Sequence, residues 1–331
     1  LARQSLADPE LPNKMREGRY DDVRKCIVCD LGCSYRHIVQ WVADCAVNYE
    51  VMREPEVERL MDRNTRLQKV SIVGGGPAGL EAARWAALKG HTVTLYEKGN
   101  ALGGLVDTVS RTPHVYMKEL RNVIEWEVHQ IDKLPVTVNL GVEATPEMVA
   151  QDEPDVVLLA VGAARRTLDV PGADSDKVVD LLAYLRGKAE IGERVVVVGG
   201  DEGAEAALSL ARAGHTVTLL AAGEEIGDAP YLKYIGRQLL LRKMIEEQEI
   251  MVATGVAVKA VEPQGVVVLV DGVEWLARAD TVVVALGRSP NDEVVAQWQD
   301  ALPNVIPVGD CVDPVSIRSA IHGAARTVLN L

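Results

Sequence analysis

The stretch that decides the fold is "VSIVGGGPAGLEAARWAALKGHTVTLYEKG", residues 70–99. It begins as a short β-branched strand, passes through a glycine-rich turn and continues as about a dozen helix-forming residues before a second strand. This order is a βαβ unit, and its continuous apolar strands are typical of a parallel sheet that is covered on both faces. The sequence therefore predicts an α/β fold built on parallel strands.

The turn between strand and helix carries a G-x-G-x-x-G pattern made by Gly74, Gly76 and Gly79. The first glycine permits the tight turn, the second lets the backbone approach a pyrophosphate, and the third lets helix and strand pack closely. The following helix directs its N-terminal N–H groups at the phosphates. Glu97 ends the second strand, where a carboxylate can accept hydrogen bonds from a ribose diol. Together these features predict a dinucleotide site.

A second segment, "RVVVVGGDEGAEAALSLARAGHTVTLLAAG" at residues 194–223, repeats the first, and the shared "GHTVTL" fixes the alignment. Gly200 and Gly203 match the last two glycines of the first loop. At the positions of the turn glycine and the ribose-binding acid, however, the second loop has Val198 and Ala221. Two such units predict two doubly wound nucleotide-binding domains, the second of which either binds a nucleotide or serves only packing and docking.

The cysteines are concentrated in "CIVCDLGCSYRHIVQWVADC", residues 26–45, which holds four of the five in the chain. Their spacing is C-x2-C-x3-C-x11-C. Structural zinc sites usually use two separated C-x2-C pairs, whereas three close thiolates and one distant thiolate suit a 4Fe–4S cluster. The cluster is the favoured interpretation, with zinc and incidental buried thiols as the alternatives. The candidate ligands are Cys26, Cys29, Cys33 and Cys45.

The composition limits the partners. The net charge is −13 and the isoelectric point is about 5.0, so the basic surface of a nucleic-acid-binding protein is absent and an anionic membrane would repel the chain. No apolar run has the roughly 20 residues that a membrane span needs. Clustered thiols fit a reducing compartment, so a cytoplasmic location is expected.

Upstream of the glycine loop, "ARQSLADPELPNKMREGRYDDVRKCIVCDLGC" (residues 2–33) resembles the join between barrel and cluster in the iron–sulfur members of the Old Yellow Enzyme family. These include 2,4-dienoyl-CoA reductase, enoate reductases and trimethylamine dehydrogenase. The resemblance covers essentially the whole chain, and the cysteine block together with "GGGPAG" (residues 74–79) makes it specific. It implies two glutathione-reductase-type Rossmann domains preceded by a 4Fe–4S segment. It also implies an FMN-binding TIM barrel that is absent from this chain, and hence a barrel domain or subunit as partner and an oligomer.

The resemblance also implies site residues. The cluster ligands carry over to the four cysteines named above, and Arg3 would hold the FMN phosphate. The contacts to FAD, or to ADP in its place, would fall on Gly74, Gly76, Gly79, Glu97, Gly104, Val142, Gly162, Gly309 and Asp310. The contacts to NAD(P)H, if the second site is used, would fall on Gly200, Gly203, Gly287 and Arg288. No catalytic residue is expected on this chain, because substrate chemistry takes place on the FMN barrel in such proteins.

The expected organisation follows from these motifs. We expect a barrel connector at residues 1–24, the 4Fe–4S segment and a linker at 25–68, the FAD (or ADP) domain at 69–188 with 290–331, and an NAD(P)-binding-like domain at 189–289.

Three functions are consistent with this organisation. The first passes electrons from NAD(P)H to FAD, the cluster and FMN to reduce an activated C=C bond, and the x3 cysteine spacing, as in the dienoyl-CoA reductase branch, favours it. The second is amine oxidation or N-demethylation, in which electrons leave through the cluster to an electron-transfer flavoprotein. The third is a non-catalytic nucleotide-binding scaffold. Val198 and Ala221 favour the second and third.

Overall fold

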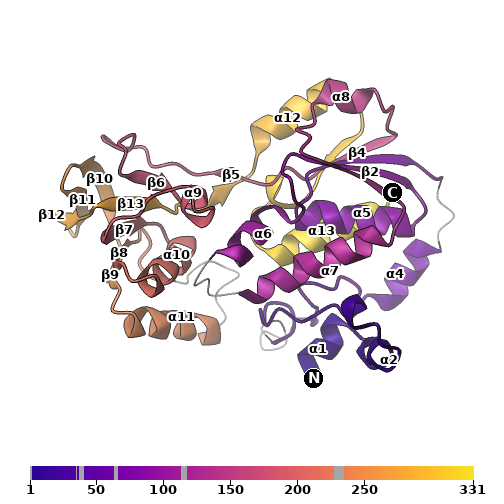
Figure 1. Ribbon diagram of the computed structural model, residues 1–331, viewed down its shortest axis with the longest axis horizontal. Coiled ribbons are helices and arrows are strands. Elements are labelled where there is room, and N and C mark those ends of the chain that lie inside the picture. Colours follow the sequence, from indigo (N-terminus) through magenta and orange to yellow (C-terminus); the bar gives the residue numbers. More distant parts are fainter. Residues whose placement is uncertain (1, 35, 37–40, 63–65, 113–117, 227–234) are drawn as a thin grey trace. The chain divides into compact units, whose positions relative to one another are not determined.

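The computed structural model describes residues 2–34, 36, 41–62, 66–112, 118–226 and 235–331, and these form an α/β fold with two parallel sheets (Figure 1). The chain divides into two compact units. Unit 1 comprises Leu1–Ser110, Glu119–Ala164 and Ser289–Leu331, and unit 2 comprises Arg111–Lys118 and Arg165–Arg288. The expected α/β class with Rossmann-like domains is confirmed.

The division after Ala164 lies earlier than the expected end of the first domain at residue 188. The cause is β6 (Val178–Asp180), which pairs in parallel with β13 (Thr281–Val284) and therefore belongs to the second sheet. This strand has three residues and carries no clear periodicity in the sequence, so the sequence does not mark the crossing into the second sheet.

Unit 1 contains a five-stranded parallel sheet in the order β15-β4-β1-β2-β3. Its strands are β1 (Lys69–Val73), β2 (Thr92–Glu97), β3 (Val136–Leu140), β4 (Val156–Leu159) and β15 (Val305–Pro307). Alternate residues of a strand face opposite sides of a sheet. Ile72 accordingly packs on the side of the helices α5 (Pro77–Leu88), α7 (Arg121–Asp132) and α13 (Ile317–Leu329). Val73 packs on the side of α8 (Pro146–Ala150) and α12 (Asp292–Ala301). Both faces are covered, as the continuous apolar strands predict.

The helices of unit 1 pack against the cysteine segment as well as against the sheet. They are α5 (Pro77–Leu88), α6 (Gly104–Arg111), α7 (Arg121–Asp132), α8 (Pro146–Ala150), α12 (Asp292–Ala301) and α13 (Ile317–Leu329), with the short 3-10 turns η2 (Lys118–Leu120) and η3 (Gly309–Cys311). Small buried residues along α5, among them Ala82 and Ala86, let it pack against both α7 and α13. The C-terminal strand and helix thus complete the first domain.

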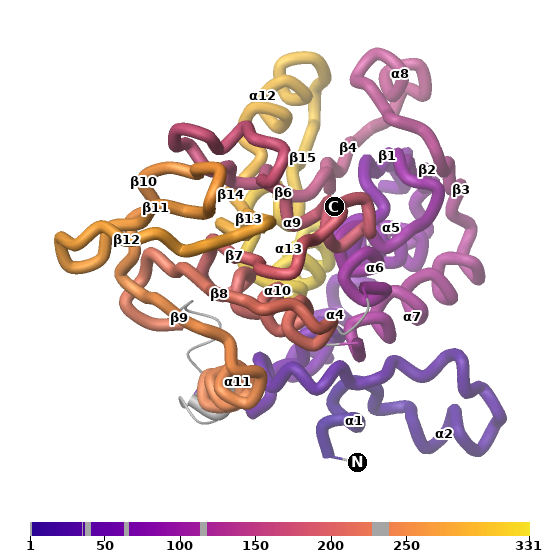
Figure 2. The backbone as a smooth tube through the Cα atoms, turned by 60° about the vertical axis from the view of Figure 1, so that its left-hand side comes forward, coloured from indigo at the N-terminus to yellow at the C-terminus, as the bar shows by residue number. Residues whose placement is uncertain are grey.

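Unit 2 repeats the plan with the strand order β6-β13-β7-β8-β9. Its further strands are β7 (Arg194–Val198), β8 (Thr216–Leu220) and β9 (Met251–Ala253), and its helices are α9 (Leu181–Leu185), α10 (Asp201–Arg212) and α11 (Ile235–Glu247). An antiparallel sheet of β10 (Ala257–Glu262), β11 (Gly265–Val270) and β12 (Val273–Arg278) is attached (Figure 2). Asp271 and Gly272, both at positive φ, form the hairpin turn between β11 and β12. The chain enters and leaves unit 2 through β5 (Ala164–Arg165) and β14 (Arg288–Ser289), which pair with each other.

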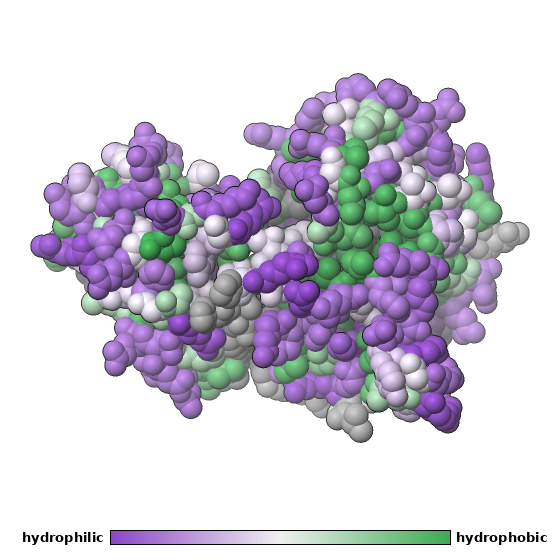
Figure 3. Space-filling model, in the orientation of Figure 1, coloured by the Kyte–Doolittle hydropathy of each residue, from purple (hydrophilic) through white to green (hydrophobic). Residues whose placement is uncertain are grey.

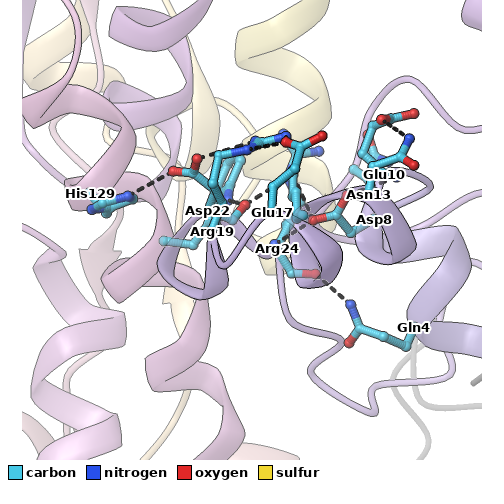
Figure 4. A network of polar contacts seen from close by, with 12 residues as sticks. Gln4, Asp8, Glu10, Asn13, Glu17, Arg19, Asp22, Arg24 and His129 are labelled. Carbon is cyan, nitrogen blue, oxygen red and sulfur yellow. Dashed lines mark hydrogen bonds and ion pairs between the residues drawn. The ribbon is translucent and has the colours of Figure 1, made fainter.

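The N-terminal segment consists of α1 (Ala2–Ala7), α2 (Leu11–Arg16), η1 (Tyr20–Asp22) and, after the cysteines, α4 (Glu54–Met61). It is attached to α7 through Asp22. His129 Nε2 lies 2.8 Å from the Asp22 carboxylate, and Trp126 Nε1 donates to the Asp22 carbonyl at 3.0 Å (Figure 4). The segment is therefore fixed to unit 1 by hydrogen bonds as well as by packing.

The surface of the two units differs in character. Figure 3 shows a patch of hydrophobic residues on unit 1, whereas hydrophilic residues cover most of unit 2 in the same view. Within the described residues, none of the helices combines the length and the apolar character that crossing a membrane requires.

Candidate functional site

The three glycines of the first loop have different structural roles. Gly74 follows β1 at φ +106°, and a Cβ there would lie 2.3 Å from the Ala160 carbonyl oxygen. A Cβ on Gly79 would lie 1.9 Å from the Gly74 carbonyl oxygen, so this position also accepts only glycine. Gly76 has an ordinary φ of −78°, and a Cβ there would meet nothing within 4 Å. The fold thus needs Gly74 and Gly79, whereas the space in front of Gly76 is left for a ligand.

Glu97 lies at the carboxyl edge of the first sheet, beside this loop. Its two carboxylate oxygens accept hydrogen bonds from the backbone N–H of Gly75 at 2.7 Å and of Gly99 at 2.6 Å. The carboxylate is therefore held where the strands β1 and β2 end. That is the position at which an acid binds the ribose of a dinucleotide.

Other residues expected at this site gather around the same loop. A Cβ on Gly104, the first residue of α6, would lie 3.1 Å from Gly76 Cα. Val142 N–H donates to the Glu97 carbonyl at 3.0 Å. Gly309 has φ +75° and approaches Ala78, in the first turn of α5.

Gly162 follows β4 at φ +73°, with nothing within 4 Å of an added Cβ, and Asp310 lies in η3. The structure thus brings segments from six parts of unit 1 to one sheet edge. The residues present fit a dinucleotide flavin, because backbone N–H groups, open space and a carboxylate meet there.

The second loop corrects the sequence alignment. Gly199 N–H donates to the Leu220 carbonyl at 2.9 Å, just as Gly74 N–H donates to the Tyr96 carbonyl at 2.8 Å. A Cβ on Gly199 would lie 1.9 Å from the Ala285 carbonyl oxygen. Gly199 is therefore the turn glycine of the second loop, and the interpretation of Val198 as its replacement is wrong.

The actual difference is one of length. Gly200 precedes α10 as Gly76 precedes α5, so each is the N-cap of its helix. The second loop consequently lacks one residue between turn glycine and helix, and Gly75 has no counterpart. The alignment on "GHTVTL" is correct for the helix and the second strand of each unit and shifted by one residue in the first strand.

The helix that follows the second loop begins with two acids, Asp201 and Glu202. The Glu202 carboxylate lies 3.7 Å from Arg165 and 3.7 Å from Arg288. Ala221 follows β8 and is buried, so this strand end offers no carboxylate.

The two other residues expected here are glycines. Gly287 lies at φ +80° with open space around it, whereas a Cβ on Gly203 would lie 3.3 Å from the Leu219 side chain. The second candidate site thus shares the strand–turn–helix geometry of the first but differs from it in charge.

The cysteine segment lies against unit 1. Cys26, Cys29 and Cys45 pack on one hydrophobic cluster that includes Val123 of α7 and Ile321 of α13. Burial, together with the charges of the other three cysteines of the segment, raises the pKa of Cys29 to about 12. The four thiols are therefore electrostatic neighbours, and none of them is in a disulfide.

Metal centres bind the thiolate form, so a bound iron–sulfur cluster or zinc ion would have to displace the protons of these thiols. In the described part of the chain, no three or more His, Cys, Asp or Glu side chains are grouped as metal ligands. The four cysteines accordingly stay a prediction from spacing and proximity.

Polar contacts position this segment. Gln4 accepts from Cys26 N–H at 2.8 Å and donates to the Arg24 carbonyl at 2.9 Å, and Figure 4 shows its side chain pointing at Arg24. His322 of α13 lies 2.8 Å from the Cys45 carbonyl oxygen. The chain on either side of the cysteines is thus held by side chains of α1 and α13.

Asp44 is the main anchor, and sequence reasoning missed it. Its carboxylate is 1% exposed and receives Arg318 Nε at 3.0 Å, with Arg53 at 3.5 Å and Arg36 at 3.6 Å. Burial alone would raise the pKa of Asp44, but the bond from Arg318 holds it below its ordinary value. The only signal in the sequence was its place directly before Cys45.

Arg3, expected at an FMN phosphate, is half-exposed and pairs with Asp30 at 2.5 Å. The hydrogen bond from Arg3 to Asp30 raises the pKa of Arg3, as do the charges of Cys26 and Cys33. Arg3 thus lies beside the cysteine segment, and its role toward FMN stays a prediction.

Comparisons with known proteins agree with this geometry. Residues 68–312 match the family described as pyridine nucleotide-disulphide oxidoreductase. A cinnamate reductase of Clostridium sporogenes is 34% identical over 100% of this chain and 49% of its own length. An NADH oxidase of Thermoanaerobacter brockii is 33% identical over 97% of this chain and 50% of its own length.

Among solved structures, a complex of 2-naphthoyl-CoA reductase with 2-naphthoyl-CoA superposes with a TM-score of 0.92 at 31% identity. The match covers 99% of this chain and 50% of that one. The chain thus spans about half the length of the curated relatives that it matches. From the glycine loops, the two parallel sheets and these matches, we conclude that the chain is an oxidoreductase of the pyridine nucleotide-disulphide oxidoreductase family and corresponds to the C-terminal FAD- and NAD-binding part of the Old Yellow Enzyme-like iron–sulfur flavoproteins.

Proposed function

We propose that this chain is the electron-transfer part of an iron–sulfur flavin reductase, in which electrons pass from NAD(P)H to FAD in unit 1, to a 4Fe–4S cluster and on to FMN of a barrel domain or subunit. FAD supplies exchange of electron pairs and the cluster supplies exchange of single electrons. The reaction served would be reduction of an activated C=C bond, in the cytoplasm.

The observation that carries the proposal is the attachment of the cysteine segment to unit 1. His322 of α13 contacts the Cys45 carbonyl, and Val123 of α7 packs beside the cysteines. Both helices also pack on α5, the helix that begins at the flavin loop, either directly or through the shared core. A redox centre at the cysteines would therefore belong to the same rigid unit as the flavin site.

Different residues of unit 1 would bind different parts of the flavin. The loop of Gly74, Gly76 and Gly79 would receive the pyrophosphate at the N-terminus of α5, and Glu97 would accept the ribose hydroxyls. The remaining contacts to the flavin would come from Gly104, Val142, Gly162, Gly309 and Asp310.

The cysteine segment would hold the cluster through Cys26, Cys29, Cys33 and Cys45. Arg24 is buried, and its positive charge lowers the pKa of Cys45 against the effect of burial, which raises it. A buried guanidinium thus offsets part of the negative charge that thiolates and cluster would bring.

The direction of electron flow is supported by the relatives named above, which are called reductases or an NADH oxidase, and by the x3 cysteine spacing. The short, acidic second loop favours the alternative, in which electrons leave FMN through the cluster to an electron-transfer flavoprotein and unit 2 binds no nucleotide. NAD(P)H binding by unit 2 is the point on which the two differ.

Composition analysis tests the cofactors. Chain purified without oxygen should hold about four iron atoms and four acid-labile sulfides, and its extract should contain FAD. Cys29→Ser should lose the iron and keep the FAD. Cys311→Ser is the matched control, because Cys311 lies in η3 within the core of unit 1 and should leave the iron unchanged. One zinc per chain, or ADP in place of FAD, would contradict the proposal.

A further inference from the structure

The two nucleotide-binding helices begin with opposite electrostatic character. α5 has no acid in its first turn, whereas α10 begins with Asp201 and Glu202. A helix N-terminus carries positive partial charge and binds either an anionic ligand or the acids of its own chain. In unit 2 the chain itself therefore supplies an anion at the place where a dinucleotide would bring its pyrophosphate.

Glu202 is held there by two arginines from outside the helix. One carboxylate oxygen lies 3.7 Å from Arg288 Nε and the other lies 3.7 Å from Arg165 NH2. Glu202 Oε2 and the NH2 group of Arg165 are both buried and lack a hydrogen-bond partner among the described residues. The Glu202 carboxylate and the Arg165 guanidinium thus attract each other electrostatically but form no hydrogen bond. A ligand anion that does form hydrogen bonds with Arg165 could replace the carboxylate.

The strands β5 and β14 bring these arginines to the second loop. Arg165 also bonds Asp180 at 2.8 Å, so its guanidinium is fixed in orientation. Arginine pairs bind phosphate oxygens with a geometry that a single carboxylate cannot satisfy fully. The two guanidinium groups and the α10 N-terminus together form an anion-binding arrangement, and Glu202 lies in it.

We propose that Glu202 occupies the pyrophosphate position of unit 2 and sets the affinity for NAD(P)H, because the dinucleotide must displace the carboxylate from Arg165 and Arg288. This inference rests on the proposed entry of electrons from NAD(P)H. The missing residue of the second loop acts in the same direction, since it brings the acid at the helix start closer to the turn glycine, Gly199, along the chain.

The test is a titration of the FAD-loaded chain with NADH and, separately, with ADP-ribose, which carries the pyrophosphate without a reactive nicotinamide. Glu202→Gln keeps the size of the side chain and removes its charge, so it should lower the dissociation constant for both ligands about tenfold at low salt. The gain should shrink at high salt, because it is electrostatic.

Asp201→Asn is the matched control. It removes the same charge from the same helix end and leaves Glu202 between the two arginines, so it should change either constant by less than about threefold. Equal effects of the two substitutions would overturn the inference in favour of a general charge effect at the helix end.

The outcomes separate the inference from the proposed function. If both wild type and Glu202→Gln bind NADH equally well, the inference is wrong and the NAD(P)H route stands. If only Glu202→Gln binds, the inference is supported and the wild-type chain does not take electrons from NAD(P)H. If neither binds NADH or ADP-ribose, both ideas are wrong.

Discussion

Gly76 and Gly79 lie three residues apart at the start of α5, and each position requires glycine for a different reason. A side chain on Gly79 would collide with the Gly74 carbonyl, whereas a side chain on Gly76 would extend into open space. A turn of this kind needs one glycine for its own backbone geometry and the other for the close approach of its ligand. The two glycines therefore separate folding from flavin binding experimentally.

Gly76→Ala should leave the stability of the flavin-free protein within about 0.5 kcal/mol of wild type and strongly lower its FAD content, because the new methyl group projects toward the pyrophosphate. Gly79→Ala should destabilise the flavin-free protein by about 1–3 kcal/mol or more, since backbone must move. Denaturant unfolding and the ratio of flavin to protein measure the two effects. Full FAD content in Gly76→Ala would show that the pyrophosphate does not lie at this residue.

At the same scale, the sequence predicted the first loop well and the second loop badly. The first loop matches its pattern residue by residue, so each glycine could be given a role. In the second, the strand and its turn glycine (residues 195–199) match the first at an offset of 125 residues, whereas the helix and "GHTVTL" match at an offset of 124. An alignment fixed on "GHTVTL" alone therefore misses the deletion, and the strand hydrogen bonds show that Gly199 makes the turn.

At the scale of elements, the cysteine segment is held on α13 by Asp44. Removing one partner of a buried ion pair leaves the other charges uncompensated, which typically costs about 3–5 kcal/mol. Asp44→Asn should therefore loosen the segment from Arg318, lower the iron content and expose the segment to protease, while the FAD content stays unchanged. Asp30→Asn removes an exposed pair with Arg3 and should leave both contents unchanged. Normal iron content in Asp44→Asn would contradict the anchoring role.

The contact of α5 with α7 buries an unusual acid pair. Glu81 accepts from Arg84 and Trp85 at 2.7–2.9 Å, and Glu127 is fully buried beside it. Burial raises the pKa of Glu127 well above its ordinary value of 4.5, and the charge of Glu81 raises it further. Burial also acts on Glu81, but Arg84 and Arg24 keep the pKa of that carboxyl below its ordinary value. Glu127 thus retains its proton when the protein folds.

This pair predicts a pH dependence of stability. The folded protein binds a proton at Glu127 that the unfolded chain releases above about pH 4.5, so the free energy of unfolding should fall as the pH rises from there through the raised pKa, by at most about 1.4 kcal/mol per pH unit. Glu127→Gln should flatten this fall in denaturant unfolding measured from pH 5 upward. Glu125→Gln, an exposed change on the same helix, should keep the wild-type slope. An unchanged slope in Glu127→Gln would refute the protonated state.

The sequence could not have revealed the acid pair. Glu81 and Arg84 are spaced three apart on α5, which is the pattern of an exposed helix pair. They are buried because α7 and the N-terminal segment cover a side of α5 that its periodicity marks as polar, with Arg24 stacked 3.8 Å over the Trp126 ring. Contacts between segments more than 30 residues apart in the chain decide burial here.

At the scale of the whole molecule, the repeat predicted two nucleotide-binding units and the return of the C-terminus to the first. The predicted domain boundary at residue 188 differs from the observed one at Ala164, because the short strands β5 and β6 carry little periodicity. The spacing predicts the four cysteines as one set of ligands, whereas Asp44, Gln4 and His322, which position the segment, have no motif. Motifs describe the groups that would touch a cofactor, and the groups that hold those residues become visible only in the fold.

In the proposed function, electrons enter at a nucleotide of unit 2 and reach the cysteine segment through the flavin of unit 1. The most direct measurement adds NADH, and separately NADPH, without oxygen to the chain carrying FAD and its cluster, and follows both absorbances over time. The account predicts that the flavin bleaches first and the cluster follows, with faster flavin bleaching at low NADH in Glu202→Gln. Bleaching by dithionite but by neither nucleotide, in wild type and variant alike, would contradict it.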